Sequence, residues 1–320
     1  MVVQGPHRFP LHGWIGLAGL FVAEALLLLR VELVGQWFYV LAWWPYILVV
    51  DALVFRRKGT SLLADHRREF LFLLPWSICF WLTFELFNLR LGNWHYLDVP
   101  ESLPLRWSGY AVSFATVIPG LFETTQLLEA YGVFRSAASP RISSSTGWSG
   151  PFVAIGLAFS ILPLVWPQYF FPLVWGCFTF LLEPLNYRLG GRSLMRQWQE
   201  GSLRTFYLLL AAGAVCGLLW EFWNFWAVTK WIYTVPSVGF LKIFEMPLLG
   251  FLGFPPFAVE CYVMINTISL LRGNRSWEHP KPGKVQARPV ETVLLAVGLL
   301  AYSLFVFHQI DLHTVATWRP

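Results

Sequence analysis

Nine runs of mostly apolar residues, each close to the length of a membrane-spanning helix, occupy most of this chain. A helix needs about 20 apolar residues to cross the hydrocarbon core of a bilayer. The runs lie at about 12–30, 37–55, 70–88, 107–128, 151–166, 169–187, 205–224, 247–271 and 290–310. Only 13% of the residues are charged, whereas soluble domains carry about 25%. The sequence therefore predicts an all-α polytopic membrane protein with about nine transmembrane helices.

Lysine and arginine residues cluster after every second run. The clusters are Arg56, Arg57, Lys58, Arg67 and Arg68; Arg135 and Arg141; Arg188, Arg192 and Arg196; and Arg272, Arg275, Lys281, Lys284 and Arg288. Because positively charged loops stay on the cytoplasmic side, this pattern predicts a cytoplasmic N-terminus and an outer C-terminus. We expect the bacterial inner (cytoplasmic) membrane as the location. The net charge of +5 arises largely from these loops and does not indicate a nucleic-acid partner.

The first eight runs read as a four-helix unit repeated in tandem. Moved by 132 residues, the segment 36–62 aligns with 168–194 without a gap, and the identities include Arg, Gly, Ser and Gln. Offsets of 136 and 137 residues continue the match. The later pairs are Glu85 with Glu221, Asn88 with Asn224, Trp94 with Trp231, Tyr96 with Tyr233, Pro119 with Pro256 and Glu123 with Glu260. Because the unit holds an even number of spans, both copies enter the membrane in the same direction, about an axis along the membrane normal.

This pattern divides the chain into successive segments. Residues 1–135 form the first four-helix repeat, 136–149 a Ser-rich cytoplasmic linker, 150–272 the second four-helix repeat, 273–289 a cytoplasmic basic loop, and 290–320 the ninth helix and an outer tail. The Gly- and Pro-rich run 247–256 predicts a broken or kinked helix, which a membrane tolerates only where protein or a cavity satisfies the backbone.

Carboxylates within the apolar runs are the candidate catalytic groups. An acidic residue at a helix centre costs about 2.5–3.5 kcal/mol on insertion scales, so each one predicts a partner or a function. Glu85 and Glu221 are each followed three residues later by an asparagine, Asn88 or Asn224, which places Glu and Asn on one helical face. A buried Glu beside an amide and aromatic rings is suited to act as a general acid.

Further carboxylates lie deeper or nearer the cytoplasmic ends. Glu123 and Glu260 follow a proline by one turn, and either proton transfer or a structural hydrogen bond to a neighbouring helix accounts for them. Asp51 and Glu183 lie close to Arg56 and Arg188, which predicts interfacial ion pairs.

Aromatic residues of the outer loops are the candidate substrate-binding groups, together with the two asparagines. They are Trp94, Tyr96, Trp231 and Tyr233. Two interpretations stay open for these Trp and Tyr residues. They cover the Glu–Asn sites, or they anchor the helices at the membrane interface, where Trp and Tyr are common.

Several kinds of chemistry lack their residues here. No lysine lies inside a predicted span, which excludes a retinal Schiff base. The histidines lie outside the spans or at the end of the last one, which argues against haem and di-iron sites. The four cysteines form no CxxC pair and read as packing residues. We expect no metal and no cofactor.

The order of these motifs resembles a known family. Trp81-Leu82-Thr83-Phe84-Glu85 precedes Gly92-Asn93-Trp94-His95-Tyr96 and then Pro119 and Glu123, and the second half has Trp220-Glu221, Trp231-Ile232-Tyr233, Pro256 and Glu260. The pattern is similar to the membrane lycopene-cyclase domain, which occurs as two homologous halves. The resemblance covers spans three, four, seven and eight, and implies acid-catalysed chemistry on a carotenoid-like isoprenoid. A single Glu replaces the family's Pro-x-Glu-Glu pair in both halves.

Three functions are compatible with these features. The first is a non-redox cyclase, isomerase or hydratase that acts on an isoprenoid or another membrane lipid. The second is a lipid- or pigment-binding subunit that joins a membrane-protein partner. The third is a proton-coupled transporter, against which the parallel repeat and the high aromatic content weigh.

Overall fold

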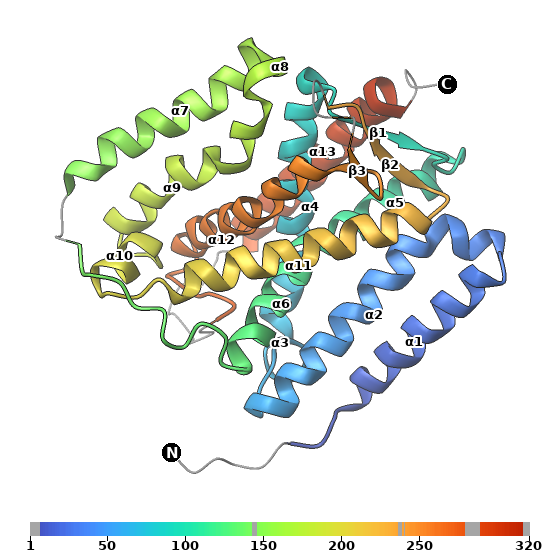
Figure 1. Ribbon diagram of the computed structural model, residues 1–320, viewed down its shortest axis with the longest axis horizontal. Helices are drawn as coiled ribbons and strands as arrows, with labels where there is room; N and C mark the ends of the chain where they lie inside the picture. Colours follow the sequence, from blue (N-terminus) through green and yellow to red (C-terminus); the bar gives the residue numbers. More distant parts are fainter. Residues whose placement is uncertain (1–6, 143–145, 236–238, 240, 279–288, 316–320) are drawn as a thin grey trace.

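The computed structural model describes residues 7–142, 146–235, 239, 241–278 and 289–315, and helices form almost all of the fold (Figure 1). The first part of the chain contains α1 (Leu11–Leu28), α2 (Glu32–Lys58), α3 (Leu62–Asp65), α4 (Arg67–Leu91), β1 (Trp94–Leu97), α5 (Leu103–Phe114) and α6 (Val117–Ala130). The second part contains η1 (Thr146–Trp148), α7 (Ser149–Val165), α8 (Pro167–Phe170), η2 (Phe171–Gly176), α9 (Cys177–Arg188), α10 (Leu194–Gln199), α11 (Arg204–Trp226), β2 (Lys230–Tyr233), β3 (Lys242–Ile243), β4 (Met246–Pro247), η3 (Leu248–Gly253) and α12 (Phe254–Leu270). The last described elements are α13 (Pro289–Ile310) and the π-helical η4 (Asp311–Val315).

Seven helical segments in the described part of the chain are long and apolar enough to cross a membrane. They are Leu11–Leu28, Glu32–Lys58, Arg67–Leu91, Leu103–Ala130, Arg204–Trp226, Leu248–Leu270 and Val290–Val315. The prediction of a helical, membrane-embedded protein is thereby confirmed. The remaining two predicted spans correspond to the shorter apolar helix α7 and to the interrupted segment α8-η2-α9, whose prolines, Pro167 and Pro172, lack the N–H that a continuous helix needs.

A second interruption precedes α12. The run 247–256 forms a short strand and the 3-10 segment η3 before α12 begins at Phe254, as the prediction of a broken helix requires. Pro255 and Pro256 occupy the first turn of α12, where the missing N–H groups would have no helical partner in any case. Both interrupted segments, η2 and η3, contact α12.

The basic ends of the helices meet at one end of the molecule. Arg272, after α12, donates to both oxygens of Glu69 at the start of α4, at 2.8 and 3.0 Å. Lys58, at the end of α2, lies 2.5 Å from Glu129 of α6, and Arg204 donates to the Glu129 carbonyl at 3.1 Å. The strands β1 and β2 lie at the opposite end (Figure 1). The fold therefore has one basic end and one end that carries the small sheet.

The predicted ion pairs of Asp51 with Arg56 and of Glu183 with Arg188 are wrong, and the basic side chain beside Asp51 is His12, whose Nε2 lies 2.8 Å from Asp51 Oδ2. Asp51 accepts hydrogen bonds from Ser61 Oγ at 2.7 Å and from the Leu63 N–H at 2.8 Å. Glu183 accepts the equivalent bonds from Ser193 Oγ at 2.5 Å and from the Met195 N–H at 2.9 Å. No ion pair in the described structure joins either carboxylate to the arginine five residues later. Each carboxylate is directed inward instead, where it holds the start of the short helix that follows.

Helices α11 and α12 approach closely along glycines. A Cβ atom at Gly213 would lie 2.4 Å from the Phe254 carbonyl oxygen and 2.8 Å from Pro255 Cα, which are backbone atoms that cannot rotate away. Small residues at helix contacts allow such backbone approach in membranes. Gly213 therefore sets the position of α12 against α11.

Replacing Gly213 with Ala is expected to lower the free energy of unfolding by about 1–3 kcal/mol, because the added methyl group overpacks this contact. The measurement is denaturant unfolding in detergent micelles. Gly298→Ala on α13 is the matched control, since nothing lies within 4 Å of a Cβ atom at that position. Equal loss of stability in both variants would contradict the close-packing interpretation.

Candidate active site in an aromatic cavity

The site is organised by an antiparallel pair of strands. Trp94 of β1 lies opposite Tyr233 of β2, and Tyr96 lies opposite Trp231. Residues that match in the sequence repeat, such as Trp94 and Trp231, are therefore not opposite each other. Each tryptophan faces the tyrosine of the other repeat. This register places two aromatic pairs from distant parts of the chain in one small sheet.

The two asparagines anchor these strands. Asn88 Nδ2 donates to the Trp94 carbonyl at 2.9 Å, and Asn88 Oδ1 accepts from the Asn93 N–H at 2.8 Å. Asn224 Nδ2 donates to the Trp231 carbonyl at 2.8 Å, and its Oδ1 accepts from the Trp231 N–H at 2.9 Å. Neither asparagine is among the described residues that line the cavity. Their observed contacts position the aromatic residues that do.

Glu85 accepts hydrogen bonds from three aromatic side chains. Trp81 Nε1 donates to Oε1 at 2.8 Å, and Trp94 Nε1 lies 3.1 and 3.3 Å from the two carboxylate oxygens. Tyr96 OH also donates to Oε1. Glu85 is fully buried. An ionised carboxylate is an acceptor only, and these donors satisfy it in that form.

Glu221 has a different environment at the matched position. Tyr233 OH lies 2.8 Å from Glu221 Oε1, and Trp231 Nε1 donates to the Tyr233 oxygen at 2.8 Å instead of reaching the carboxylate. Glu221 Oε2 is buried and has no hydrogen-bond partner among the described residues. Burying a charge with a single donor is costly, so this arrangement suits a neutral carboxylic acid. The two glutamates are thus equivalent in sequence and unlike in their hydrogen bonding.

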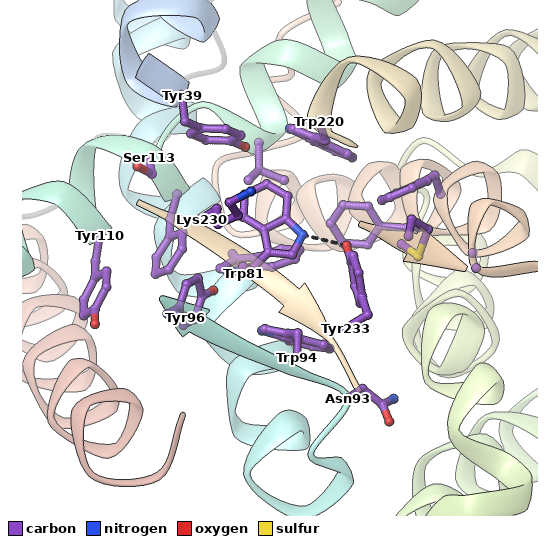
Figure 2. A pocket seen from close by; sticks show the side chains of 18 of the residues that line it. Tyr39, Trp81, Asn93, Trp94, Tyr96, Tyr110, Ser113, Trp220, Lys230 and Tyr233 are labelled. Carbon is purple, nitrogen blue, oxygen red and sulfur yellow. Dashed lines mark hydrogen bonds between the residues drawn. The ribbon is translucent and has the colours of Figure 1, made fainter. Parts of the chain in front are cut away.

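A cavity of about 430 Å³ lies against the sheet. Its aromatic lining consists of Trp37, Tyr39, Trp81, Trp94, Tyr96, Tyr110, Phe114, Phe171, Trp175, Trp220, Trp231, Tyr233, Phe254 and Phe257. This volume falls within the range of about 300–1,000 Å³ typical of small-molecule sites. Figure 2 shows Tyr96, Trp94 and Tyr233 along the two strands, with Tyr39 and Trp220 across from them.

The two glutamates lie one hydrogen bond behind this wall. Neither Glu85 nor Glu221 is among the described lining residues, whereas Tyr96 and Tyr233 line the cavity and contact the carboxyl groups. Burial and the neighbouring carboxyl groups raise the pKa of both phenols far above the ordinary value, so both keep their protons. Each tyrosine oxygen therefore links a carboxyl group to the cavity.

The charged lining residues are already paired. Lys230 Nζ lies 3.1 Å from Glu245 Oε1, and Arg106 makes a two-point contact with Asp311 at 2.8 and 2.9 Å. Charges that are neutralised in this way leave little attraction for an ionic ligand. The cavity is therefore suited to an uncharged, largely apolar molecule.

The deeper glutamates are not brought to this cavity. Glu123 is fully buried, and neither of its carboxyl oxygens has a hydrogen-bond partner among the described residues. Glu260 Oε1 accepts from the Phe178 N–H at 2.6 Å, which ties α12 to the start of α9. Neither residue is among the described residues that line the cavity. The structure thus separates the four candidate glutamates. Glu85 and Glu221 contact tyrosines of the cavity wall, and Glu123 and Glu260 lie away from it.

Two contributors to the site were missing from the sequence-based set. Trp81 lies four residues before Glu85, a spacing that places both on one helical face and could have identified it. Asp311 accepts from Arg106, Trp107 and Tyr110, more than 200 residues earlier in the chain. No local pattern connects these residues. The described residues include no group of three or more His, Cys, Asp and Glu side chains arranged to hold a metal ion.

No protein-family model matches this sequence, and comparisons with curated proteins and with solved structures found no match.

Proposed function

We propose that this protein is a membrane enzyme that moves protons to and from carbon in an isoprenoid-like lipid. The observation that carries the proposal is the unequal pair of buried carboxyl groups behind one aromatic cavity. Groups whose environments favour opposite protonation states are suited to act as acid and base in one site. Glu221 takes the role of the acid and Glu85 that of the base.

On the acid side, the proton leaves through Tyr233. In the structure Tyr233 OH donates to Glu221 Oε1 at 2.8 Å and accepts from Trp231 Nε1 at 2.8 Å. In the acid form that we propose, the first bond reverses, and the protonated Glu221 donates to the Tyr233 oxygen. The phenol then has two donors at its oxygen, and its own proton is free to point into the cavity. Transfer of that proton to a C=C bond produces a carbocation, while Glu221 re-protonates the phenol oxygen.

On the base side, Glu85 draws a proton away through Tyr96. The Tyr96 oxygen takes a proton from a carbon next to the cation, which restores a C=C bond, while Tyr96 passes its own proton to Glu85. The substrate gains one proton and loses one, so the net reaction is an isomerisation or a cyclisation. At the end Glu85 holds a proton and Glu221 lacks one, and transfer of that proton from Glu85 to Glu221 resets the site. Aromatic faces around the cavity stabilise the cation in between.

The lining of the cavity supports the proposed substrate class. An uncharged ligand with C=C bonds fits a cavity whose ionic side chains are paired and whose walls are rings. Isoprenoids have these properties and dissolve in the membrane. The resemblance of the motifs around Glu85 and Glu221 to the membrane lycopene-cyclase domain supports the same class.

The architecture we propose is a tandem duplication with nine spans, in which α7 and α9 provide the fifth and sixth. The equivalent bonds of Asn88 and Asn224, and those of Asp51 and Glu183, support the duplication. We place the basic end in the cytoplasm and the sheet outside, in the bacterial inner membrane, because basic loops are retained on the cytoplasmic side.

The test is mass spectrometry of lipids extracted from protein purified out of its membrane, comparing the wild type with the Glu85→Gln/Glu221→Gln double variant. We expect a product lipid with the wild-type protein and its untransformed precursor with the variant. A preparation made in D₂O provides a second readout, because protonation at carbon places deuterium from the solvent in the product.

Two results would contradict catalysis. The same bound isoprenoid in both proteins, free of deuterium, would identify a lipid- or pigment-binding protein, a function that the aromatic cavity also suits. Bulk phospholipid alone in both preparations would remove the isoprenoid proposal itself.

A further inference from the structure

Three residues on the described wall of the cavity are exposed at the surface of the protein. Of the described residues that line it, only Pro172, Leu249 and Leu252 are exposed. Leu249 and Leu252 have 59% and 69% of their surface accessible. Pro172 belongs to η2, and the two leucines belong to η3. The most exposed part of the described wall, here called the opening, therefore lies at the two 3-10 segments that interrupt the helices.

The border of this opening is apolar. The segments 166–182 and 246–259 contain no Asp, Glu, Lys or Arg. The segment η3 begins the membrane-length stretch Leu248–Leu270. Trp166 and Tyr169, both exposed, lie just before η2, and such residues favour the membrane interface. These features place the opening within the hydrocarbon layer, close to its edge.

The two borders touch over a small contact. A Cβ atom at Gly253 would lie 3.1 Å from Trp175 Cδ1, so the glycine allows η3 to approach the ring that lines the cavity. Each segment is a 3-10 helix of only six residues. The hydrogen bonds of a 3-10 helix have poorer geometry than those of an α-helix. Separation of η2 from η3 therefore costs fewer regular backbone bonds than movement of a full α-helix.

We infer that uncharged lipids enter and leave the cavity sideways from the bilayer, through the opening between η2 and η3. This inference rests on the proposed function, since it requires that the cavity binds a membrane-dissolved apolar ligand. An apolar molecule that passes here remains in contact with apolar surface along its whole route, so it avoids the cost of transfer through water.

The test blocks the opening with a bulky group. Leu252→Cys is purified, labelled with pyrenyl maleimide and reconstituted in phosphatidylcholine vesicles; the native cysteines among the described residues are all buried. Donor vesicles then supply squalene, an uncharged isoprenoid, and bound squalene is measured by mass spectrometry at intervals after the protein is captured. We expect the pyrenyl group to slow uptake at least about tenfold, which corresponds to a modest increase in the barrier.

Two controls separate the possible causes. Leu294→Cys, labelled in the same way, carries the group on the exposed face of α13, away from the cavity, and is expected to load at the wild-type rate. Leu252→Cys modified with a methylthio group restores a small side chain and is also expected to load normally, which shows that the substitution leaves the fold intact.

Each outcome has a distinct meaning. Equal uptake by the two pyrenyl-labelled proteins would overturn the entrance and leave the ligand class standing. An unlabelled wild-type protein that takes up no squalene would overturn the proposed ligand class, and the entrance with it.

Discussion

Replacing Glu221 with Gln is expected to reduce product formation by about 10²–10⁴-fold, the usual contribution of a positioned general acid. The amide has nearly the shape of the acid and keeps an oxygen for Tyr233 OH, which lies 2.8 Å from Glu221 Oε1. It has no acidic proton to deliver. Ligand should therefore still bind, and the bound species should be the precursor. The measurement is deuterium incorporation from D₂O during single-turnover incubation with the extracted lipid.

A matched control lies on α1. Glu24 is another carboxyl group within a membrane-length helix; it accepts a bond from Trp223 Nε1 at 3.3 Å and is not among the described cavity residues. Glu24→Gln is expected to retain activity. If both variants are equally active, Glu221 does not supply the proton. If both lose activity together with ligand binding, the defect is structural.

Replacing Asp311 with Ala is expected to lower the free energy of unfolding by about 3–5 kcal/mol, because it leaves a mostly buried guanidinium without its partner. Asp311 accepts from Arg106 Nε at 2.8 Å and Nη2 at 2.9 Å, from Trp107 Nε1 at 2.9 Å and from Tyr110 OH at 3.1 Å. The side chains of Asp311 and Arg106 are 13% and 17% exposed. Denaturant unfolding in detergent measures the loss.

The double variant Arg106→Ala/Asp311→Ala distinguishes the cause. Removal of both charges leaves no unpaired ion, so the double variant should be more stable than Asp311→Ala alone. A double variant that is less stable by the sum of both single losses would show that the pair acts through packing rather than charge. Because Tyr110 and Arg106 line the cavity, loosening of α13 should also weaken lipid retention.

Much of the site was accessible from spacing along the chain. Asn88 follows Glu85 by three residues, and the match of Trp94 and Tyr96 with Trp231 and Tyr233 indicated that both outer loops belong with the glutamates. The structure brings the four aromatic residues into one sheet beside one cavity, and Asn88 bonds to its first strand. Spacing succeeded here because residues one helical turn apart share a face, whatever the rest of the fold does.

The roles of the same residues could not be read from spacing. The asparagines were expected to bind substrate, and their described contacts are to the backbone of the strands. Glu85 and Glu221 were expected to face the ligand, and tyrosines stand between them and the cavity. The direction of a side chain depends on its neighbours from other helices. Two residues that match between the sequence repeats can have different neighbours in the fold, and the match does not reveal them.

The sequence by itself determined that this chain is a helical membrane protein, because the cost of placing a residue in hydrocarbon is local and adds up along each run. It also identified the carboxylates that such a membrane tolerates only with a partner or a function. Only the tertiary structure decided that Glu85 has three donors and Glu221 one, that Arg106 meets Asp311 across 205 positions, and that η2 and η3 supply the exposed part of the described cavity wall. These features depend on contacts between segments far apart in the chain, whose geometry is set by packing rather than by any property of the segments alone.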